Sequence, residues 1–193
     1  DFQEAWDVFK DADKIQIDLA IVGNHATEDT SVTLTNYVTG ITEGPARRDC
    51  VVIASPPREF IVGTSPTSAV SNTVGWSNKL NASSYLICDN NYLKTYDKYN
   101  DKYVFIPAAS STAGLMAATD RVAAPWFSPA GQRRGRYLGV TSLAYTPDKT
   151  QRDTLYKANV NPIVNLPGQG VLLYGDKTKE ARPSAFDRIN VRR

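Results

Sequence analysis

The chain has 193 residues, of which 41% are hydrophobic and 22% are charged. That composition is typical of one folded domain with a sizeable core, and it excludes a disordered chain. No apolar run in the sequence is long enough to span a bilayer, and no secretory leader pattern opens the chain.

The net charge of +2 hides an asymmetry along the chain. Residues 1–30 carry eight acidic and two basic side chains, whereas residues 131–193 carry twelve Lys and Arg against five Asp and Glu. On general grounds such a chain forms internal salt bridges as a monomer. Opposite charges at its two ends also allow copies to pair head to tail.

The first half of the sequence alternates helix and strand patterns. The expected order is a helix with Phe2, Ala5, Trp6 and Phe9 on one face, a strand at 15–22, a helix capped near Thr27 and ended by Gly44-Pro45, a strand at 49–55, a helix at 67–80 capped by Ser65, and a strand at 85–88. This rhythm predicts an α/β fold with a mostly parallel sheet flanked by helices.

The next elements are local ones. Two runs of alternating aromatic and aliphatic residues, 92–96 and 103–107, flank a polar turn and predict a β-hairpin insertion. Its tyrosines are typical of cross-strand pairs, and the alternative is that they stack on nucleic-acid bases. The Ala-rich stretch 108–122 predicts a helix.

After Ala124 the sequence changes character, so we divide the chain into an α/β core at 1–124 and a second part at 125–193. Prolines and a glycine in 125–131 predict an extended segment that buries Trp126 and Phe127 against the core. The expected elements beyond it are a basic cluster at 132–136, a polar helix at 148–159 held by Leu155 and Tyr156, short strands at 162–164 and 171–174, and a helix starting at Phe186. Because that helix is cut off at Arg193, we expect more chain in the natural protein.

The sequence lacks the residues that catalysis or metal binding would need. His25 is the only histidine, it is read as a loop residue that caps a turn, and no Gly-x-Ser-x-Gly motif supplies a nucleophile. Cys50 and Cys88 sit in apolar runs, which predicts buried reduced thiols and offers too few ligands for zinc. The glycines of 170–178 imitate a phosphate loop, but the residues between them predict a buried strand. We therefore expect no enzyme, no cofactor and no metal.

Several stretches of the second part, taken in order and at their spacing, resemble the tail sheath proteins of contractile bacteriophages, in particular the T4-like phage sheaths. These stretches are Ala124-Pro125-Trp126-Phe127-Ser128-Pro129-Ala130-Gly131 with Arg134-Gly135, Gln151-Arg152-Asp153-Thr154-Leu155-Tyr156, Val160-Asn161-Pro162-Ile163, Pro167-Gly168-Gln169-Gly170, Gly175-Asp176-Lys177-Thr178 and Phe186-Asp187-Arg188-Ile189-Asn190-Val191-Arg192-Arg193. The first helix and first strand resemble the same family more loosely.

The resemblance implies a structural subunit with a subtilisin-like topology that lacks catalytic residues. Such subunits polymerise as stacked rings around a tail tube and contract to drive genome ejection. The implied partners are other copies of the chain, the tail tube protein, the baseplate and the tail terminator, with no membrane insertion and no nucleic acid. The implied location is the virion tail, reached from the host cytoplasm during assembly. A sheath from a phage-derived injection or secretion machine is the related alternative.

The charge asymmetry supplies the candidate contact residues between copies. They are Asp7, Asp11 and Asp13 on the acidic side and Arg133, Arg134 and Arg136 on the basic side. Opposed acidic and basic faces would give a stack of subunits its polarity. Two other classes stay open at this point: a nucleic-acid-binding module that uses the Arg-rich third, and a hydrolase of subtilisin-like topology.

Overall fold

The computed structural model describes residues 2–23 and 27–193. Its centre is a parallel sheet whose strands lie in the order β1 (Leu19–Val22), β2 (Val51–Ala54), β3 (Leu86–Asp89) and β7 (Val160–Asn161). The mixed α/β architecture with a parallel sheet flanked by helices is confirmed. The fourth strand, β7, was not predicted, because its two residues carry too little pattern to be recognised.

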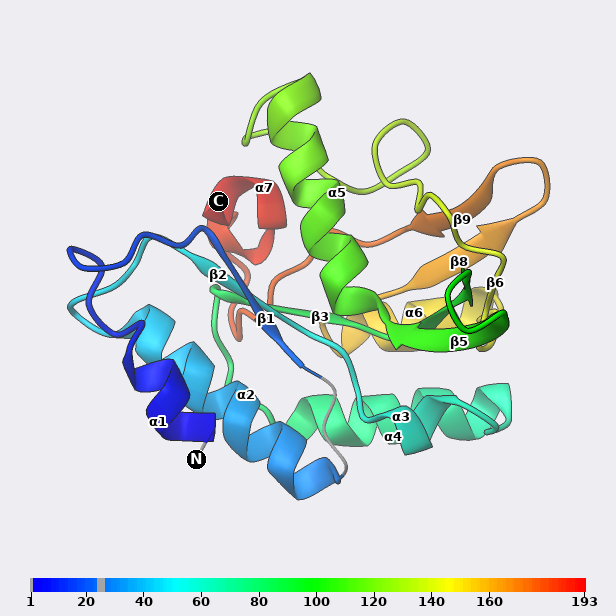
Figure 1. Cartoon of the computed structure of the whole chain (residues 1–193), viewed down its shortest axis with the longest axis horizontal. Helices are drawn as coiled ribbons and strands as arrows, with labels where there is room; N and C mark the ends of the chain where they lie inside the picture. Colours follow the sequence, from blue (N-terminus) through cyan, green and yellow to red (C-terminus); the bar gives the residue numbers. More distant parts are fainter. Residues whose placement is uncertain (1, 24–26) are drawn as a thin grey trace.

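Helices cover both faces of this sheet (Figure 1). On one side lie α1 (Phe2–Asp7), α2 (Glu28–Glu43), the short α3 (Arg58–Ile61) and α4 (Pro66–Lys79), and on the other lie α5 (Ala108–Val122) and α7 (Ile189–Arg192). Alternate residues of the strands pack against the helices on the two faces of the sheet. Val52 and Leu86 face the α2 and α4 side, whereas Ile53 and Ile87 face α5 and α7. Burial on both faces explains why these strands are almost purely apolar.

The predicted caps fix where the covering helices begin. The Thr27 side chain accepts a hydrogen bond from the backbone N–H of Thr30 at the start of α2, and the Ser65 side chain does the same for Ser68 in α4. Pro66 occupies the first turn of α4, where its missing N–H costs nothing. Gly44 follows the last residue of α2 as its C-cap. Local chemistry therefore sets these boundaries to within about a residue of the prediction.

The hairpin insertion is β4 (Tyr92–Asp97) paired antiparallel with β5 (Lys102–Pro107), and β6 (Ser142–Leu143) adds to its β4 edge. Tyr96 lies opposite Tyr103 with ring centroids 5.3 Å apart, which is the cross-strand pair expected from the sequence. A second hairpin, β8 (Ile163–Leu166) and β9 (Gly170–Leu173), closes another cluster of buried residues with α5. The stretch that imitates a phosphate loop is thus a strand, as predicted.

Two predicted elements differ from the structure. The strand expected at 15–22 begins only at Leu19, since residues 15–17 have no regular structure and the Ile15 carbonyl accepts a hydrogen bond from the buried Arg47 guanidinium instead of a neighbouring strand. The helix expected from Phe186 is a 3-10 turn, η1 (Ala185–Asp187), followed by α7 after a break at Arg188. The polar helix exists as α6 (Lys149–Lys157), capped by Asp148 and Gln151 and anchored by the buried Leu155.

Candidate interaction surface

The acidic candidates lie on α1 and in the turns that follow it. Asp7 pairs with Lys10 at 2.7 Å and accepts a hydrogen bond from the Tyr37 hydroxyl, and these hydrogen bonds lower the pKa of its carboxyl. Asp11 pairs with Lys14 at 3.3 Å and accepts a hydrogen bond from the backbone of Asp13. Two of the three carboxylates are therefore partly neutralised by neighbours, and Asp13 is exposed to solvent.

One buried arginine fixes the position of the acidic segment, which we define as residues 2–18. The Arg47 side chain is fully enclosed and donates to the backbone oxygens of Phe9 and of Ile15, the latter at 2.6 Å. Its Nε donates to the Asp49 carboxylate at 3.1 Å. A buried charge needs such a complete set of partners. The acidic segment is consequently held to the start of β2 rather than left as a loose tail.

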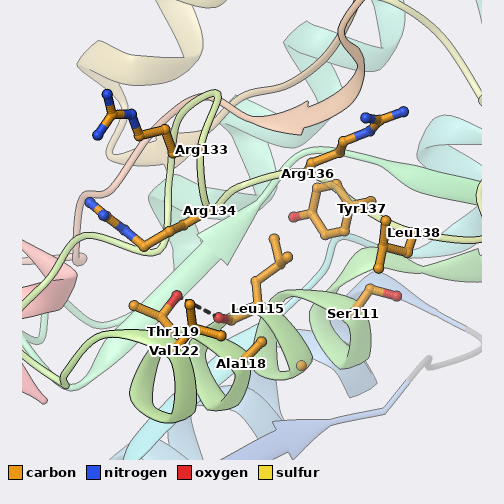
Figure 2. A pocket seen from close by; sticks show the side chains of 11 residues that line it. Ser111, Leu115, Ala118, Thr119, Val122, Arg133, Arg134, Arg136, Tyr137 and Leu138 are labelled. Carbon is orange, nitrogen blue, oxygen red and sulfur yellow. Dashed lines mark hydrogen bonds between the residues drawn. The ribbon is translucent and has the colours of Figure 1, made fainter.

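The basic candidates lie on the loop between α5 and β6. Arg134 is committed within the chain, because its Nε donates to the Ser128 backbone oxygen at 2.8 Å and its guanidinium lies 5.1 Å from the Phe127 ring centroid. Arg133 and Arg136 are exposed, and neither forms an ion pair with any residue that the structure describes. Figure 2 shows the three guanidinium groups fanning out from this loop. Two positive charges are therefore available to a partner.

Below this loop lies a groove of about 490 Å³, which we call the α5 groove. Its floor is one face of α5 together with the buried Leu115 and Tyr137, and the Tyr137 hydroxyl lies 2.8 Å from that of Thr112. Its walls include the exposed side chains of Val122 and Leu138, which are 75% and 85% accessible to solvent. The groove thus combines an apolar surface with an arginine rim (Figure 2).

The structure does not bring the acidic and basic candidates together within one chain. In Figure 1, α1 and the loop that leads from α5 toward β6 lie on opposite sides of the sheet and its helices. Each set does form a cluster of its own. No contact between the two sets occurs among the described residues, so any pairing of these charges involves two copies.

Trp126 and Phe127 correct a prediction. They were expected to be buried against the core, but they are 71% and 43% exposed. The segment bends in a turn closed by the Phe127 N–H and the Ala124 backbone oxygen, and Asn190 holds the Trp126 backbone at 3.1 Å. Since α5 and α7 already cover this side of the sheet, the two rings remain at the surface. Sequence reasoning missed this exposed aromatic site because it assigned Trp126 and Phe127 to the core.

The stretches that carry the family resemblance meet at one polar junction. The Asp176 carboxylate accepts hydrogen bonds from the Ser128 hydroxyl at 3.1 Å and from Arg188, which also donates to the Tyr156 hydroxyl at 2.9 Å. The Asn161 side chain accepts from the Lys177 N–H at 2.7 Å and donates to the Lys177 carbonyl at 2.8 Å. Residues far apart in the sequence therefore form one structural unit. These structural contacts account for the order and spacing of the stretches, and no catalytic role is needed to explain them.

In the part of the chain that the structure describes, the residues suited to metal or thiol chemistry do not gather into a site. Within residues 2–23 and 27–193, no group of His, Cys, Asp and Glu could hold a metal ion. His25 lies outside the described residues. Cys50 and Cys88 are buried free thiols, as predicted, and burial raises the pKa of Cys88 to about 12. None of the helices described is both long enough and apolar enough to cross a membrane.

A sequence model of the phage tail sheath protein central domain matches residues 4–179. The chain belongs to the phage tail sheath protein family. It is 46% identical over 204 residues to the tail sheath protein of Enterobacteria phage T4, and 42% identical over 207 residues to that of Vibrio phage KVP40. Both alignments cover 100% of this chain and 31% of the relative, so the chain spans about a third of each of these sheath proteins.

Solved sheath structures share the fold. The sheath complex of an extracellular contractile injection system, PVC, in its contracted state superposes with a TM-score of 0.68 at 13% identity, covering 97% of this chain and 47% of that one. The crystal structure of a sheath tail protein from Desulfitobacterium hafniense gives a TM-score of 0.59 at 15% identity, covering 98% of this chain and 39% of that one. At these identities the likeness is one of fold.

Proposed function

We propose that the full-length protein is a structural subunit of a contractile phage tail sheath, polymerising around the tail tube and contracting to drive genome ejection. The observation that carries this proposal is the match of residues 4–179 to the sheath central domain, together with 46% identity to the T4 sheath. Residues 1–124 would form the core of the subunit, and residues 125–193 would complete it.

The proposed partners are other copies of the chain in stacked rings, the tail tube protein, the baseplate and the tail terminator. The subunit would assemble in the host cytoplasm and function in the virion tail, without enzymatic activity, a cofactor or bound nucleic acid. Solved relatives of this fold include a contracted helical sheath of the anti-feeding prophage and a baseplate of the same machine, which supports self-association and a baseplate contact.

Charge would set the polarity of the stack in this proposal. α1, which carries Asp7 and precedes Asp11 and Asp13, lies on the opposite side of the sheet from the loop that carries Arg133, Arg134 and Arg136. Opposite charges on opposite sides favour head-to-tail contact and disfavour head-to-head contact. The contact would weaken as ionic strength rises, because exposed charges are screened over about 10 Å at 0.1 M salt.

The test is electron microscopy of the full-length protein expressed alone. We expect long hollow tubes at low salt, and fewer of them after the charges of Arg133, Arg134 and Arg136 are reversed together. A full-length protein that stays monomeric at every salt concentration would contradict the sheath proposal. Tubes that form equally well from the charge-reversed variant would contradict only the proposed role of these arginines.

A second candidate is a sheath of a phage-derived injection machine, which the fold likeness to the PVC sheath favours. The identity values favour a phage, since 46% identity to the T4 sheath stands against 13% to the PVC sheath. Binding of the tail tube protein from a related phage would support the phage assignment. Selective binding of an injection-machine tube would support the second candidate.

A further inference from the structure

The α5 groove has the features of a protein interface that one chain leaves empty. It joins an apolar floor to exposed Val122 and Leu138, and Arg134 stacked on Phe127 connects it to the exposed Trp126. Soluble monomers rarely expose contiguous apolar surface without a function. Trp and Arg are also the residues that most often dominate the binding energy of an interface.

We propose that the α5 groove binds the acidic segment, residues 2–18, of a second copy of this chain. This inference rests on the proposed sheath function and names the two surfaces that meet. Exposed Arg133 and Arg136 on the groove rim would face exposed Asp13 and the Asp7 region of the neighbour. Exposed Phe2 and Val8 of the acidic segment, 71% and 59% accessible, would pack along the apolar floor.

Charge complementarity favours the acidic segment of a second copy, rather than the groove of a second copy, as the occupant of the α5 groove. Two grooves facing each other would place Arg133 and Arg136 against their own counterparts, and like charges oppose such a contact. The acidic segment has the opposite sign and also offers apolar side chains, which match both features of the groove. The β4–β5 hairpin also exposes large side chains beside two carboxylates, but it carries three lysines, whereas residues 2–18 carry five carboxylates against two lysines.

The placement of the two surfaces also determines what kind of assembly results. α1, with which the acidic segment begins, lies on the opposite side of the sheet from α5, so it cannot reach the groove of its own chain (Figure 1), whereas the segment ends at Asp18 near Asp120 of α5. Two different surfaces that meet between copies form a heterologous contact, which propagates into rings or helical filaments. Arg47 holds the acidic segment to the body of the subunit, so each contact transmits the orientation of one copy to the next.

A cross-linking experiment on the full-length protein tests the contact directly. Val8→Cys and Leu138→Cys are introduced together, and assembled tubes are treated with a short bifunctional thiol cross-linker. Cys50 and Cys88 of this chain are buried and do not compete, and cysteines elsewhere in the full-length protein are first replaced by serine. We expect a ladder of covalent oligomers on a denaturing gel. The matched control pairs Leu138→Cys with Tyr99→Cys, which is 86% exposed in the β4–β5 hairpin and outside both surfaces, and it should give no ladder.

A second variant keeps the proposal testable if the cysteine pair prevents assembly. Arg133→Glu with Arg136→Glu should raise the protein concentration needed for tube formation at least tenfold. The control is Lys98→Glu with Lys102→Glu, which makes the same change in net charge on the exposed hairpin and should leave that concentration unchanged. Tubes that form without a Val8–Leu138 cross-link, or at an unchanged concentration in the arginine variant, would overturn the groove assignment. That result leaves the sheath function intact, whereas failure of the unmodified protein to form tubes refutes the sheath function itself.

Discussion

Asp89→Asn should make the protein more stable, and increasingly so as the pH rises. Asp89 ends β3 and is completely buried. Its carboxylate accepts one hydrogen bond from the Ser55 hydroxyl at 2.9 Å and a long one from the Asn91 backbone at 3.5 Å. Burial outweighs these two interactions and raises the pKa of Asp89 from 3.8 to about 8. The folded protein therefore holds a proton there at neutral pH.

The sign and size of the effect follow from proton linkage. Between pH 3.8 and about 8, the unfolded chain has released the Asp89 proton while the folded chain keeps it. The free energy of unfolding then falls by about 1.4 kcal/mol for each unit of rising pH, and levels off above the folded pKa. From pH 5 to pH 9 this amounts to at most about 4 kcal/mol, a large share of a typical stability of about 5–15 kcal/mol.

Asparagine imitates the protonated carboxyl and does not titrate, so the variant should lose this pH dependence. Urea unfolding of both proteins at pH 5, 7 and 9 gives the measurement, and other titrating groups cancel in the difference. Asp153→Asn removes an exposed carboxylate on α6 and serves as the control, with a curve parallel to the wild type. If the stability difference between Asp89→Asn and the wild type stays constant from pH 5 to 9, Asp89 is charged in the fold and the reasoning is wrong.

Three further substitutions, two of them paired with a comparison variant, test the packing and the exposed surface. Gly135→Ala should destabilise the protein by about 1–3 kcal/mol in urea unfolding, because its Cβ would lie 2.7 to 2.8 Å from backbone atoms. At Gly114 an added Cβ meets nothing within 4 Å, so Gly114→Ala should stabilise α5 by about 0.5–1 kcal/mol. Arg47→Met should cost about 3–5 kcal/mol by stranding the carbonyls that hold the acidic segment, while the exposed Arg48→Met should stay within about 0.5 kcal/mol of the wild type. Trp126→Ala should leave the unfolding free energy within about 0.5 kcal/mol, and a larger loss would show that its ring is buried after all.

The elements of the fold that could be predicted are those whose cause is local. Caps at Thr27 and Ser65 and the stop at Gly44 act within one turn of the helix they bound, so the sequence pattern contains them. Strand β7 and the late start of β1 depend on partners far along the chain. Val160 pairs with Cys88 in the sheet, and Arg47 donates a hydrogen bond to the carbonyl of Ile15. Neither contact can be predicted from the residues next to it in the sequence.

The candidate surface shows the same limit at a larger scale. The charges of Arg133 and Asp13 are visible in the sequence, and the structure leaves both exposed. The apolar floor of the α5 groove and the exposure of Trp126 were not predictable, because an apolar residue is assigned to the core unless the geometry shows otherwise. Only the structure shows that α5 turns one face to the sheet and leaves the other to form the groove.

With the proposed groove contact, stability and assembly would depend on different residues in this chain. The interior keeps a polar side chain that is costly to disturb, Arg47, while the surface keeps Trp126 and Leu138, which contribute little to folding because they are already in contact with water. Burying those two side chains against a neighbour yields free energy that the isolated chain has not used. A variant screen should consequently separate into substitutions that unfold the subunit and substitutions that leave it folded but unassembled. If every assembly-defective variant were also unfolded, the exposed surface would have no role of its own.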